Sequence, residues 1–331
     1  MTRAATLLLS AGVLLFVGLL VSQGLPAIVA TLSLAGGGLL LVALFHMVPL
    51  ALDALAIRVL FTRAAPHAAL RDALLTRWAG ESANSLMPAG QIGGPVLMTR
   101  HLAARGMMLQ DAAAAITVST TLQTFTQIAF ALLGVSLLGA QASHLSEHAL
   151  RTSALIASGV LVVQVGGFYL MQRRGLFVKV TRVATRFSGK RDWSELLSQA
   201  ESIDLAIEGT YGRLGPVVAS LSLSLVGWLV GTGEVFLILR MVNHPVSWFN
   251  ALLLESLGQA IRGAAFAIPG ALGVQEGGYL LLAPLAGLPP DAALALSLAK
   301  RAREILLGLP GLLYLHLAER AGAAATRPVP P

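Results

Sequence analysis

Ionisable residues interrupt the last long apolar segment of the sequence, where apolar side chains would otherwise continue. They are Lys300, Arg301, Arg303 and Glu304, well inside the apolar run over residues 292–317. A charged side chain at the centre of a membrane helix costs about 2.5–3.5 kcal/mol on insertion scales, so its presence indicates a binding or pairing role. Spacings of three and four residues place Ser297 on the same helical face as three of these charges. This face therefore has the chemistry to bind a charged or polar group.

A matching stripe of neutral polar residues lies in the apolar run over residues 112–140. Its members are Thr117, Thr120, Thr121, Thr124 and Gln127. Thr120 follows Asp111 by nine residues, and Lys300 follows Asp291 by the same interval. We expect the neutral stripe and the charged stripe to face each other across an axis of approximate symmetry.

Other polar side chains gather near two segments rich in proline and glycine. The predicted substrate-binding residues are Glu81, Asn84, Gln91, Thr120, Thr124, Arg262, Glu276, Lys300, Arg301 and Glu304. For any one of them, a hydrogen bond or ion pair between helices is an equally good interpretation. Arg262 would then pair with Glu255 or Glu276. Glu304 would pair with Lys300, one turn away. Pairing alone does not explain why these residues cluster near both segments, and the clustering therefore favours a binding site.

The charged stripe also predicts what the site prefers. Its net sign is mildly basic near Lys300, and we expect helix N-termini to point at the same place. Both features favour an anion, such as the phosphate of a lipid headgroup.

No residue pattern indicates catalysis, a metal site or a cofactor. The sequence contains no cysteine, which excludes thiol catalysis, disulfide bonds and cysteine metal sites. Walker A, GxSxG and strand-linked GxGxxG patterns are absent. His144 and His148 have the spacing of helical metal ligands but lack the glutamate of an HExxH motif, so we predict an outer loop there. His46 and His316 lie singly in apolar runs, and we interpret them as packing residues.

The composition is that of a membrane protein. Hydrophobic residues make up 56% of the chain and charged residues 12%, compared with roughly 45–50% and 25% in soluble domains. A spanning helix takes about 20 apolar residues. Runs of that order extend over residues 7–29, 34–57, 112–140, 154–171, 217–239 and 292–317. The first is longer than the roughly 7–15 residues of a signal-peptide core, so we predict an uncleaved anchor. The fold class predicted is all-α, a polytopic integral membrane protein.

The distribution of positive charge predicts the topology. The net charge is +7, and eight of the 23 lysines and arginines lie between residues 173 and 213. Residues 139–150 and 241–250 contain none. By the positive-inside rule, both termini and the loop over residues 172–213 are cytoplasmic. Because the basic residues follow the membrane topology, no nucleic-acid partner is expected.

The cytoplasmic loop has an amphipathic pattern. Apolar and basic residues alternate at helical spacing: Phe177, Lys179, Val180, Arg182, Val183, Arg186 and Phe187. This pattern is typical of a helix that lies on anionic headgroups. A solvated linker that packs on the membrane domain is equally compatible with it.

Residues 81–113 and 255–293 share an order of motifs, which indicates an internal repeat. Each segment contains Glu-Ser, then a proline with a cluster of glycines, a further glycine, and Asp-Ala-Ala. The interval from the proline to the later glycine is 18 residues in both copies. The predicted topology places the first copy on the cytoplasmic side and the second on the outer side. We therefore predict a single membrane domain over residues 1–331, made of two inverted halves, residues 1–140 and 152–320.

The proline and glycine clusters are where helices would break. The predicted breaks are Pro88, Gly90 and Gly93 in the first copy and Pro269, Gly270 and Gly273 in the second. Each half would then have three spanning helices and a re-entrant helical hairpin. Non-helical backbone at membrane depth is tolerated only against protein or a watery cavity. Inverted-repeat transporters bind substrates where such discontinuous helices meet, so the two breaks should line the functional site.

The two motifs also resemble a known family. The sequence is similar, at ESANSLMPAGQIGG and IPGALGVQEGG, to the flippase-like transmembrane domain of the lysylphosphatidylglycerol synthase family. Within that family it resembles the stand-alone members associated with hopanoid biosynthesis. The resemblance covers about residues 4–317. Its most specific parts are Asn84 with Pro88, and Pro269-Gly270 with Gly273 and Glu276.

The resemblance implies a bacterial inner-membrane protein that moves, or helps to move, a lipid between leaflets. Its partners would be membrane lipids and lipid-biosynthesis enzymes. The sequence ends at Pro331 without the soluble aminoacyltransferase domain of the full-length synthases, so lysine transfer is not implied. We favour a translocase of an anionic or hopanoid-type lipid. The alternatives are a membrane-embedded lipid-modifying enzyme that uses Glu81, Glu276 or Glu304 as acid or base, a transporter of a small soluble anion, and a scaffold for hopanoid biosynthesis.

Overall fold

Helices form every regular element in the part of the chain that the structure describes. The computed structural model describes residues 30, 33–61, 69–87, 90–141, 159, 162–163, 166–186, 194–265 and 268–325. The α-helices are α3 (Gly38–Arg58), α4 (Leu70–Leu86), α5 (Gly90–Ala104), α6 (Leu109–Gln141), α8 (Leu176–Arg186), α9 (Ser194–Gly212), α10 (Leu214–Met241), α11 (Trp248–Ala264), α12 (Val274–Leu282) and α13 (Pro290–Ala325). Two short 3-10 helices are η1 (Pro269–Ala271) and η2 (Ala283–Ala286). The all-α prediction is confirmed.

Three helices are long and apolar enough to cross a membrane. They are α3, α6 over Leu109–Leu138, and α10, and they cover the predicted spans over residues 34–57, 112–140 and 217–239. The predicted span over residues 292–317 lies in the 36-residue helix α13, whose charges set it apart from these three. The span predicted over residues 7–29 lies outside the described residues, as does half of the one over residues 154–171.

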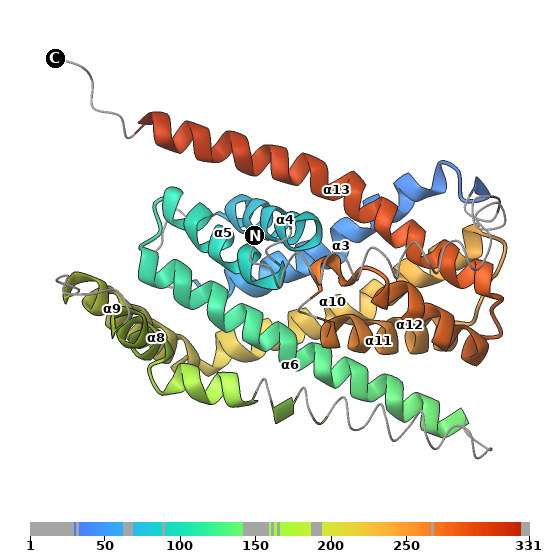
Figure 1. The fold of residues 1–331 in the computed structure, drawn as a ribbon, viewed down its shortest axis with the longest axis horizontal. Helices are drawn as coiled ribbons and strands as arrows, with labels where there is room; N and C mark the ends of the chain where they lie inside the picture. The colour runs from blue at the N-terminus through green and yellow to red at the C-terminus, as the bar shows by residue number, and fades with distance from the viewer. Residues whose placement is uncertain are drawn as a thin grey trace.

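The long helices α6 and α13 flank two helical hairpins (Figure 1). One hairpin is α4 packed against α5, and the other is α11 packed against α12. α4 lies along α13 and α11 lies along α6, so each hairpin packs against the long helix that follows the other hairpin in the sequence. α3 and α10 pack against each other, with α3 also contacting α4 and α10 contacting α11. Pro49 lies inside α3 and leaves the carbonyl of Phe45 without its helical amide donor.

Glycine allows a close approach at both crossings between a hairpin and a long helix. A Cβ on Gly311 of α13 would lie 2.0 Å from the hydroxyl oxygen of Ser82 in α4. A Cβ on Gly134 of α6 would lie 2.1 Å from the hydroxyl oxygen of Ser256 in α11. Both serines are buried. Small residues let helix backbones approach closely, and here they do so at matching places in the two hairpins.

The first hairpin turns between Leu86, the last residue of α4, and Gly90, the first of α5. Pro88 lies outside the described residues, and Gly93 lies within α5. Asn84 holds the two arms together, because its side-chain oxygen accepts a hydrogen bond from the amide of Gly94 at 3.1 Å.

The second hairpin leaves the helical conformation around η1. Gly270 has φ +61° and Gly273 has φ +75°, a left-handed region that favours glycine. Pro269 is the first residue of η1. The turn contacts α4 and α5, so the tips of the two hairpins meet. At this contact the carbonyl oxygen of Ser85 would lie 3.4 Å from a Cβ on Gly270.

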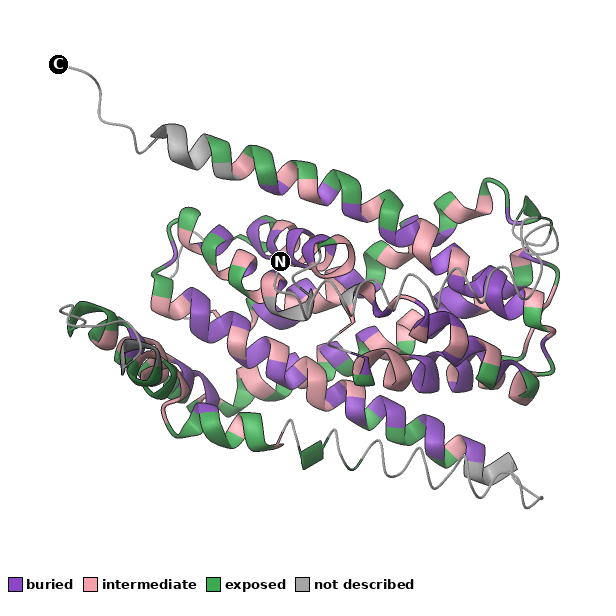
Figure 2. Ribbon diagram, viewed as in Figure 1, coloured by how far each residue is buried: buried purple, intermediate pink, exposed green. Residues whose placement is uncertain are grey.

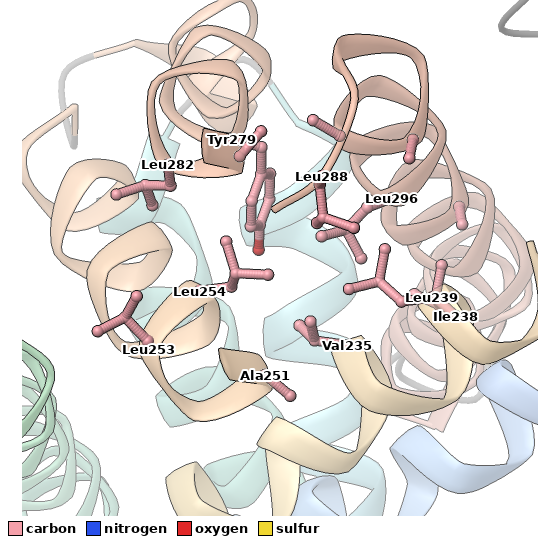
Figure 3. Close-up of a cluster of buried hydrophobic side chains, with 14 of the residues drawn as sticks. Val235, Ile238, Leu239, Ala251, Leu253, Leu254, Tyr279, Leu282, Leu288 and Leu296 are labelled. Atoms are coloured by element: carbon pink, nitrogen blue, oxygen red, sulfur yellow. The ribbon is translucent and has the colours of Figure 1, made fainter. Parts of the chain in front are cut away.

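The largest apolar core joins α10, α11, α12 and α13. Figure 3 shows Tyr279 among Leu254, Leu288 and Leu296, three leucines from two helices and the loop before α13. Full burial of a leucine side chain contributes about 1.5–3 kcal/mol, so this core holds the second hairpin rigidly. Figure 2 shows exposed residues on the outer side of α13. The exposed residues of α13 include the leucines Leu306, Leu309, Leu313 and Leu317, as expected of a helix that faces lipid.

Two helices fill the described part of the predicted loop over residues 172–213. The carboxylate of Asp204 in α9 accepts hydrogen bonds from the amides of Phe177 and Val178 at the start of α8, at 3.0 and 2.9 Å. Val180 and Val183 are more than half exposed on α8. The amphipathic pattern is therefore present as a helix, held by α9 and open on one side.

Candidate functional site

A polar cavity of about 220 Å³ lies where the two hairpins meet. Its walls come from α3, α4, α5, α6, α10, α11, α13 and η1. The ionisable residues that line it are His46, Asp53, Arg77, Glu81, Glu234, Glu255, Arg262, Arg303 and Glu304. The neutral polar residues that line it are Asn84, Ser85, Thr120, Gln123, Thr124, Gln127 and Gln259. So many ionisable groups inside helices of this hydropathy indicate a functional centre.

The charged residues of α13 form ion pairs with the second hairpin. Lys300 Nζ donates to Glu255 Oε2 at 2.6 Å, with both side chains almost fully buried. Arg301 Nε donates to Glu276 at 3.1 Å. Glu304 accepts from Arg262 at 2.5 Å and from Arg301 at 3.2 Å. The pairing predicted from spacing is wrong in detail, since Arg262 contacts Glu304 and Lys300 contacts Glu255. Lys300 and Glu304, one turn apart on α13, each have their shortest ion pair with a residue of the facing helix α11.

His46 of α3 lies between two glutamates. Its Nε2 is 2.8 Å from Glu81 of α4, and its Nδ1 is 2.9 Å from Glu234 of α10. Arg303 of α13 bridges the same two carboxylates, with Nε 3.1 Å from Glu234 and Nη1 3.4 Å from Glu81. This cluster joins four helices and lines the cavity. The interpretation of His46 as an ordinary packing residue is therefore wrong.

A third cluster continues along α3. Arg77 of α4 donates to Asp53 Oδ2 at 2.7 Å, and Gln123 of α6 donates to the same oxygen at 2.6 Å. Arg77 also lies 3.7 Å from Glu81, which connects this cluster to His46. The second and third clusters are therefore continuous, because Arg77, Glu81 and His46 link them.

The ion-paired clusters together form a charge network, which holds six carboxylates and five arginine or lysine cations, with His46 as a further basic group. Its acids are Asp53, Glu81, Glu234, Glu255, Glu276 and Glu304, and its cations are Arg77, Arg262, Lys300, Arg301 and Arg303. Each of these cations contacts a carboxylate. The prediction of a mildly basic site is wrong for the described residues, because glutamates from other helices neutralise the α13 cations and local spacing does not reveal them. Pairing offsets the desolvation cost of such buried charges.

The wall formed by α6 is neutral. The hydroxyls of Thr120 and Thr124 donate to backbone carbonyls one turn earlier, both at 2.8 Å, which leaves their oxygens as acceptors. Gln127 donates to the backbone carbonyl of Gln259 in α11 at 3.1 Å. The two predicted stripes meet only in part at the cavity, where Thr120, Thr124, Gln127 and Glu304 line it.

The predicted site residues fall into three groups. Glu81, Asn84, Thr120, Thr124, Arg262 and Glu304 line the cavity. Glu276, Lys300 and Arg301 belong to the charge network behind the lining. The side chain of Gln91 lies outside the described part of the chain. The ionisable lining residues that the prediction left out are His46, Asp53, Arg77, Glu234, Glu255 and Arg303. Each is an ionisable residue in or near an apolar run, and that placement was the available signal.

Arg301 positions the turn of the second hairpin. Its guanidinium donates to the carbonyls of Gly270 and Ala271 at 2.6 and 3.3 Å, while Glu276 accepts from the amide of Gly273 at 2.7 Å. Arg301 and Glu276 are themselves ion-paired. A planar guanidinium makes these contacts at once, which a single ammonium cannot do.

Arg301→Lys is therefore expected to loosen the turn without removing the charge. A charge-assisted hydrogen bond contributes about 1.5–3 kcal/mol, so we expect amide hydrogen exchange over residues 269–282 to accelerate roughly 10- to 100-fold. Arg320→Lys, at an exposed position of the same helix, is the matched control and should change nothing. Unchanged exchange in Arg301→Lys would remove the positioning role.

Comparison with known families decides what kind of protein carries this cavity. The family model described as the lysylphosphatidylglycerol synthase TM region matches residues 4–311. The chain belongs to the lysylphosphatidylglycerol synthase transmembrane family. The predicted family is thereby confirmed, and the match includes both hairpins and most of α13. No curated protein and no solved structure matches the chain.

Membership of the lysylphosphatidylglycerol synthase transmembrane family makes this a membrane protein linked to lipid handling. The three apolar helices agree with that assignment. The pairing of the buried charges agrees with this assignment, since the interior of a membrane protein has no bulk water to hydrate unpaired charges.

Proposed function

We propose that this protein is a lipid translocase, in which the polar cavity between the two hairpins holds a lipid headgroup while the acyl chains stay in the bilayer. The observation that carries the proposal is the charge-lined cavity of about 220 Å³ in a member of a lipid-handling membrane family. Pockets that enclose a whole small-molecule ligand usually measure about 300–1,000 Å³. A polar cavity of this size suits a headgroup, with the acyl chains outside it.

An inverted repeat is part of the proposal. The pattern of helix contacts supports it, because exchanging α3 with α10, α4 with α11, α5 with α12 and α6 with α13 maps the observed contacts onto one another. The contact of α4 with α13, for example, becomes that of α11 with α6. The hairpins would then be re-entrant, with their tips meeting at mid-membrane, as in inverted-repeat transporters. Rocking of one half against the other would expose the cavity to either leaflet.

The charge balance bears on which headgroup is bound. An anionic headgroup would have to displace a carboxylate from its cation, whereas a headgroup with both an amine and a phosphate could exchange partners with an ion pair. Hydroxyl-rich headgroups, including hopanoid-type ones, could hydrogen-bond to the carboxylates and to the neutral α6 wall. We therefore favour zwitterionic or polyhydroxylated lipids over purely anionic ones.

The remaining parts of the proposal follow the topology. The protein would reside in the bacterial inner membrane with both termini cytoplasmic, as the positive-inside rule indicates. It would act without catalysing a reaction, with membrane lipids as its partners and lipid-biosynthesis enzymes beside it. Transport is favoured over lipid modification because the sequence contains no motif with catalytic spacing.

Reconstituted vesicles test the proposal. We expect headgroup-matched, fluorescently labelled zwitterionic lipid to exchange between leaflets at least tenfold faster than in protein-free vesicles, and labelled anionic lipid to exchange more slowly than the zwitterionic one. Vesicles with heat-unfolded protein are the control for leakage and bilayer defects. No acceleration for any lipid would remove the translocase. Mass spectrometry of the same vesicles separates transport from the enzyme alternative, which requires a modified lipid product.

A further inference from the structure

The two ring nitrogens of His46 both face a carboxylate, which sets the number of protons held there. The distances are 2.8 Å to Glu81 and 2.9 Å to Glu234. A neutral imidazole has one N–H and donates one hydrogen bond, so it satisfies only one of these contacts. The other contact would place a nitrogen lone pair against an acceptor oxygen. Both contacts are satisfied only if the imidazole carries a second proton, in addition to the one that a neutral ring holds.

We propose that His46, Glu81 and Glu234 form a binding site for one exchangeable proton, and that its release and rebinding accompany each passage of a lipid headgroup. The proton site stands on geometry alone. Its coupling to lipid movement rests on the proposed function.

Charged groups on every neighbouring helix act on this proton. Arg303 of α13 binds both glutamates, and its Nη1 lies 3.3 Å from His46 Nε2, where its charge opposes that of an imidazolium. Arg77 of α4 lies 3.7 Å from Glu81 and is itself bound to Asp53 of α3. The two glutamates favour the proton and the two arginines oppose it. Because the glutamates and the arginines act in opposite directions, the imidazolium can lose its proton, whereas a guanidinium keeps its own.

Release of the proton has a structural consequence. The proton passes from the imidazolium to water in the cavity, the carboxylates and guanidiniums keep their charges, and the cluster becomes more negative by one charge. The neutral imidazole then donates to one glutamate only. The contact of α3 is lost either with α4, within the first half, or with α10, between the halves. Loss of the contact with α10 leaves the halves held together less firmly. A proton from the other side restores the contact.

A second cavity of about 10 Å³ offers a path for the proton. Asp53, Arg77, Thr120 and Gln123 line both cavities. Ser224 of α10 also lines the smaller one. Its hydroxyl is buried without a hydrogen-bond partner among the described residues, as is Arg77 Nε. A space of about 10–15 Å³ with two or more polar partners suits one water molecule.

The path extends toward the start of α10. Ser220, one turn before Ser224, is likewise buried, and its hydroxyl has no partner within the described ranges. Hydroxyls that are free to rotate can both donate and accept, which is what proton passage along water requires. The two serines therefore form a row of buried polar groups between the cavity and the N-terminal end of α10.

Nitrogen-15 NMR of histidine-labelled protein in nanodiscs tests the proton site. At a pH of about 8, where an exposed histidine is neutral, we expect both ring nitrogens of His46 to be protonated. His46→Gln identifies the signal, and exposed His316 of α13 provides the internal reference. A His46 ring with a single proton at that pH, like His316, would overturn the site.

A pH gradient across reconstituted vesicles tests the coupling. We expect wild-type lipid exchange to differ at least fivefold between the two gradient directions, and the ratio to fall to about one in His46→Gln. His316→Gln should keep the wild-type ratio. If His46→Gln does not fold, Glu81→Gln serves the same purpose, because it removes one of the two carboxylates.

The outcomes separate the two proposals. Wild-type exchange that ignores the gradient would overturn the coupling and leave the translocase standing. Absence of exchange for every lipid would overturn the translocase and the coupling with it, and the NMR result would still decide the proton site.

Discussion

Lys300→Met is expected to lower the free energy of unfolding by about 3–5 kcal/mol, because it leaves the carboxylate of Glu255 buried without a counter-ion. The side chains of Lys300 and Glu255 are 3% and 5% exposed, so water can replace little of the lost interaction with the ammonium. Only the amide of Gln259 at 2.8 Å and the hydroxyl of Tyr279 at 3.5 Å would remain as partners. Titration with SDS in mixed micelles, followed by tryptophan fluorescence, measures the change.

The double variant Lys300→Met with Glu255→Gln separates charge from packing. Removing both charges relieves the unpaired carboxylate, so most of the lost stability should return. Arg320→Met, on the exposed surface of the same helix, should change stability by less than about 0.5 kcal/mol. An equal loss in the single and the double variants would show that the ion pair is not the cause.

Gly311→Leu and Gly134→Leu are expected to destabilise the protein by similar amounts, about 3 kcal/mol each. A Cβ at either position already overlaps a serine hydroxyl. The side chain of Trp78 next to Gly311, and that of Leu257 next to Gly134, prevents the new leucine from turning aside. Overpacking of this kind costs about 1–3 kcal/mol or more, since the helices have to separate. The same SDS titration measures both variants.

Gly209→Ala is the matched control for these glycine variants. Gly209 lies in α9, and a Cβ there meets nothing within 4 Å. Replacing glycine by alanine at an unobstructed helix position should stabilise the protein by about 0.5–1 kcal/mol. A large loss for Gly311→Leu together with none for Gly134→Leu would contradict the equivalence of the two crossings.

The sequence was sufficient to locate the site but not to pair its members. Proline and glycine clusters lie next to polar residues in the sequence, so Glu81, Asn84 and Arg262 could be assigned to a cavity before the fold was known. The turn around Gly270 and Gly273 follows from glycine chemistry alone, because few other residues adopt a positive φ.

Partner choice depends on how distant helices cross. His46 and Glu234 are 188 residues apart, and their contact follows from the packing of α3 against α10. No local periodicity encodes that crossing, so the sequence alone indicates only a packing role for His46. The sign of the site was misjudged for the same reason. Lys300, Arg301 and Arg303 are close in sequence, whereas the glutamates that neutralise them come from α4, α10, α11 and α12.

The proline within α3 sits at the level of the cavity, between the segment that carries His46 and the one that carries Asp53. Because the carbonyl of Phe45 has no helical donor to lose, α3 can bend at this point without breaking a backbone hydrogen bond. Its two segments can then pivot as separate rods, each still attached to its own charged partners. A hinge of low energetic cost thus coincides with the cavity from which a headgroup would be released.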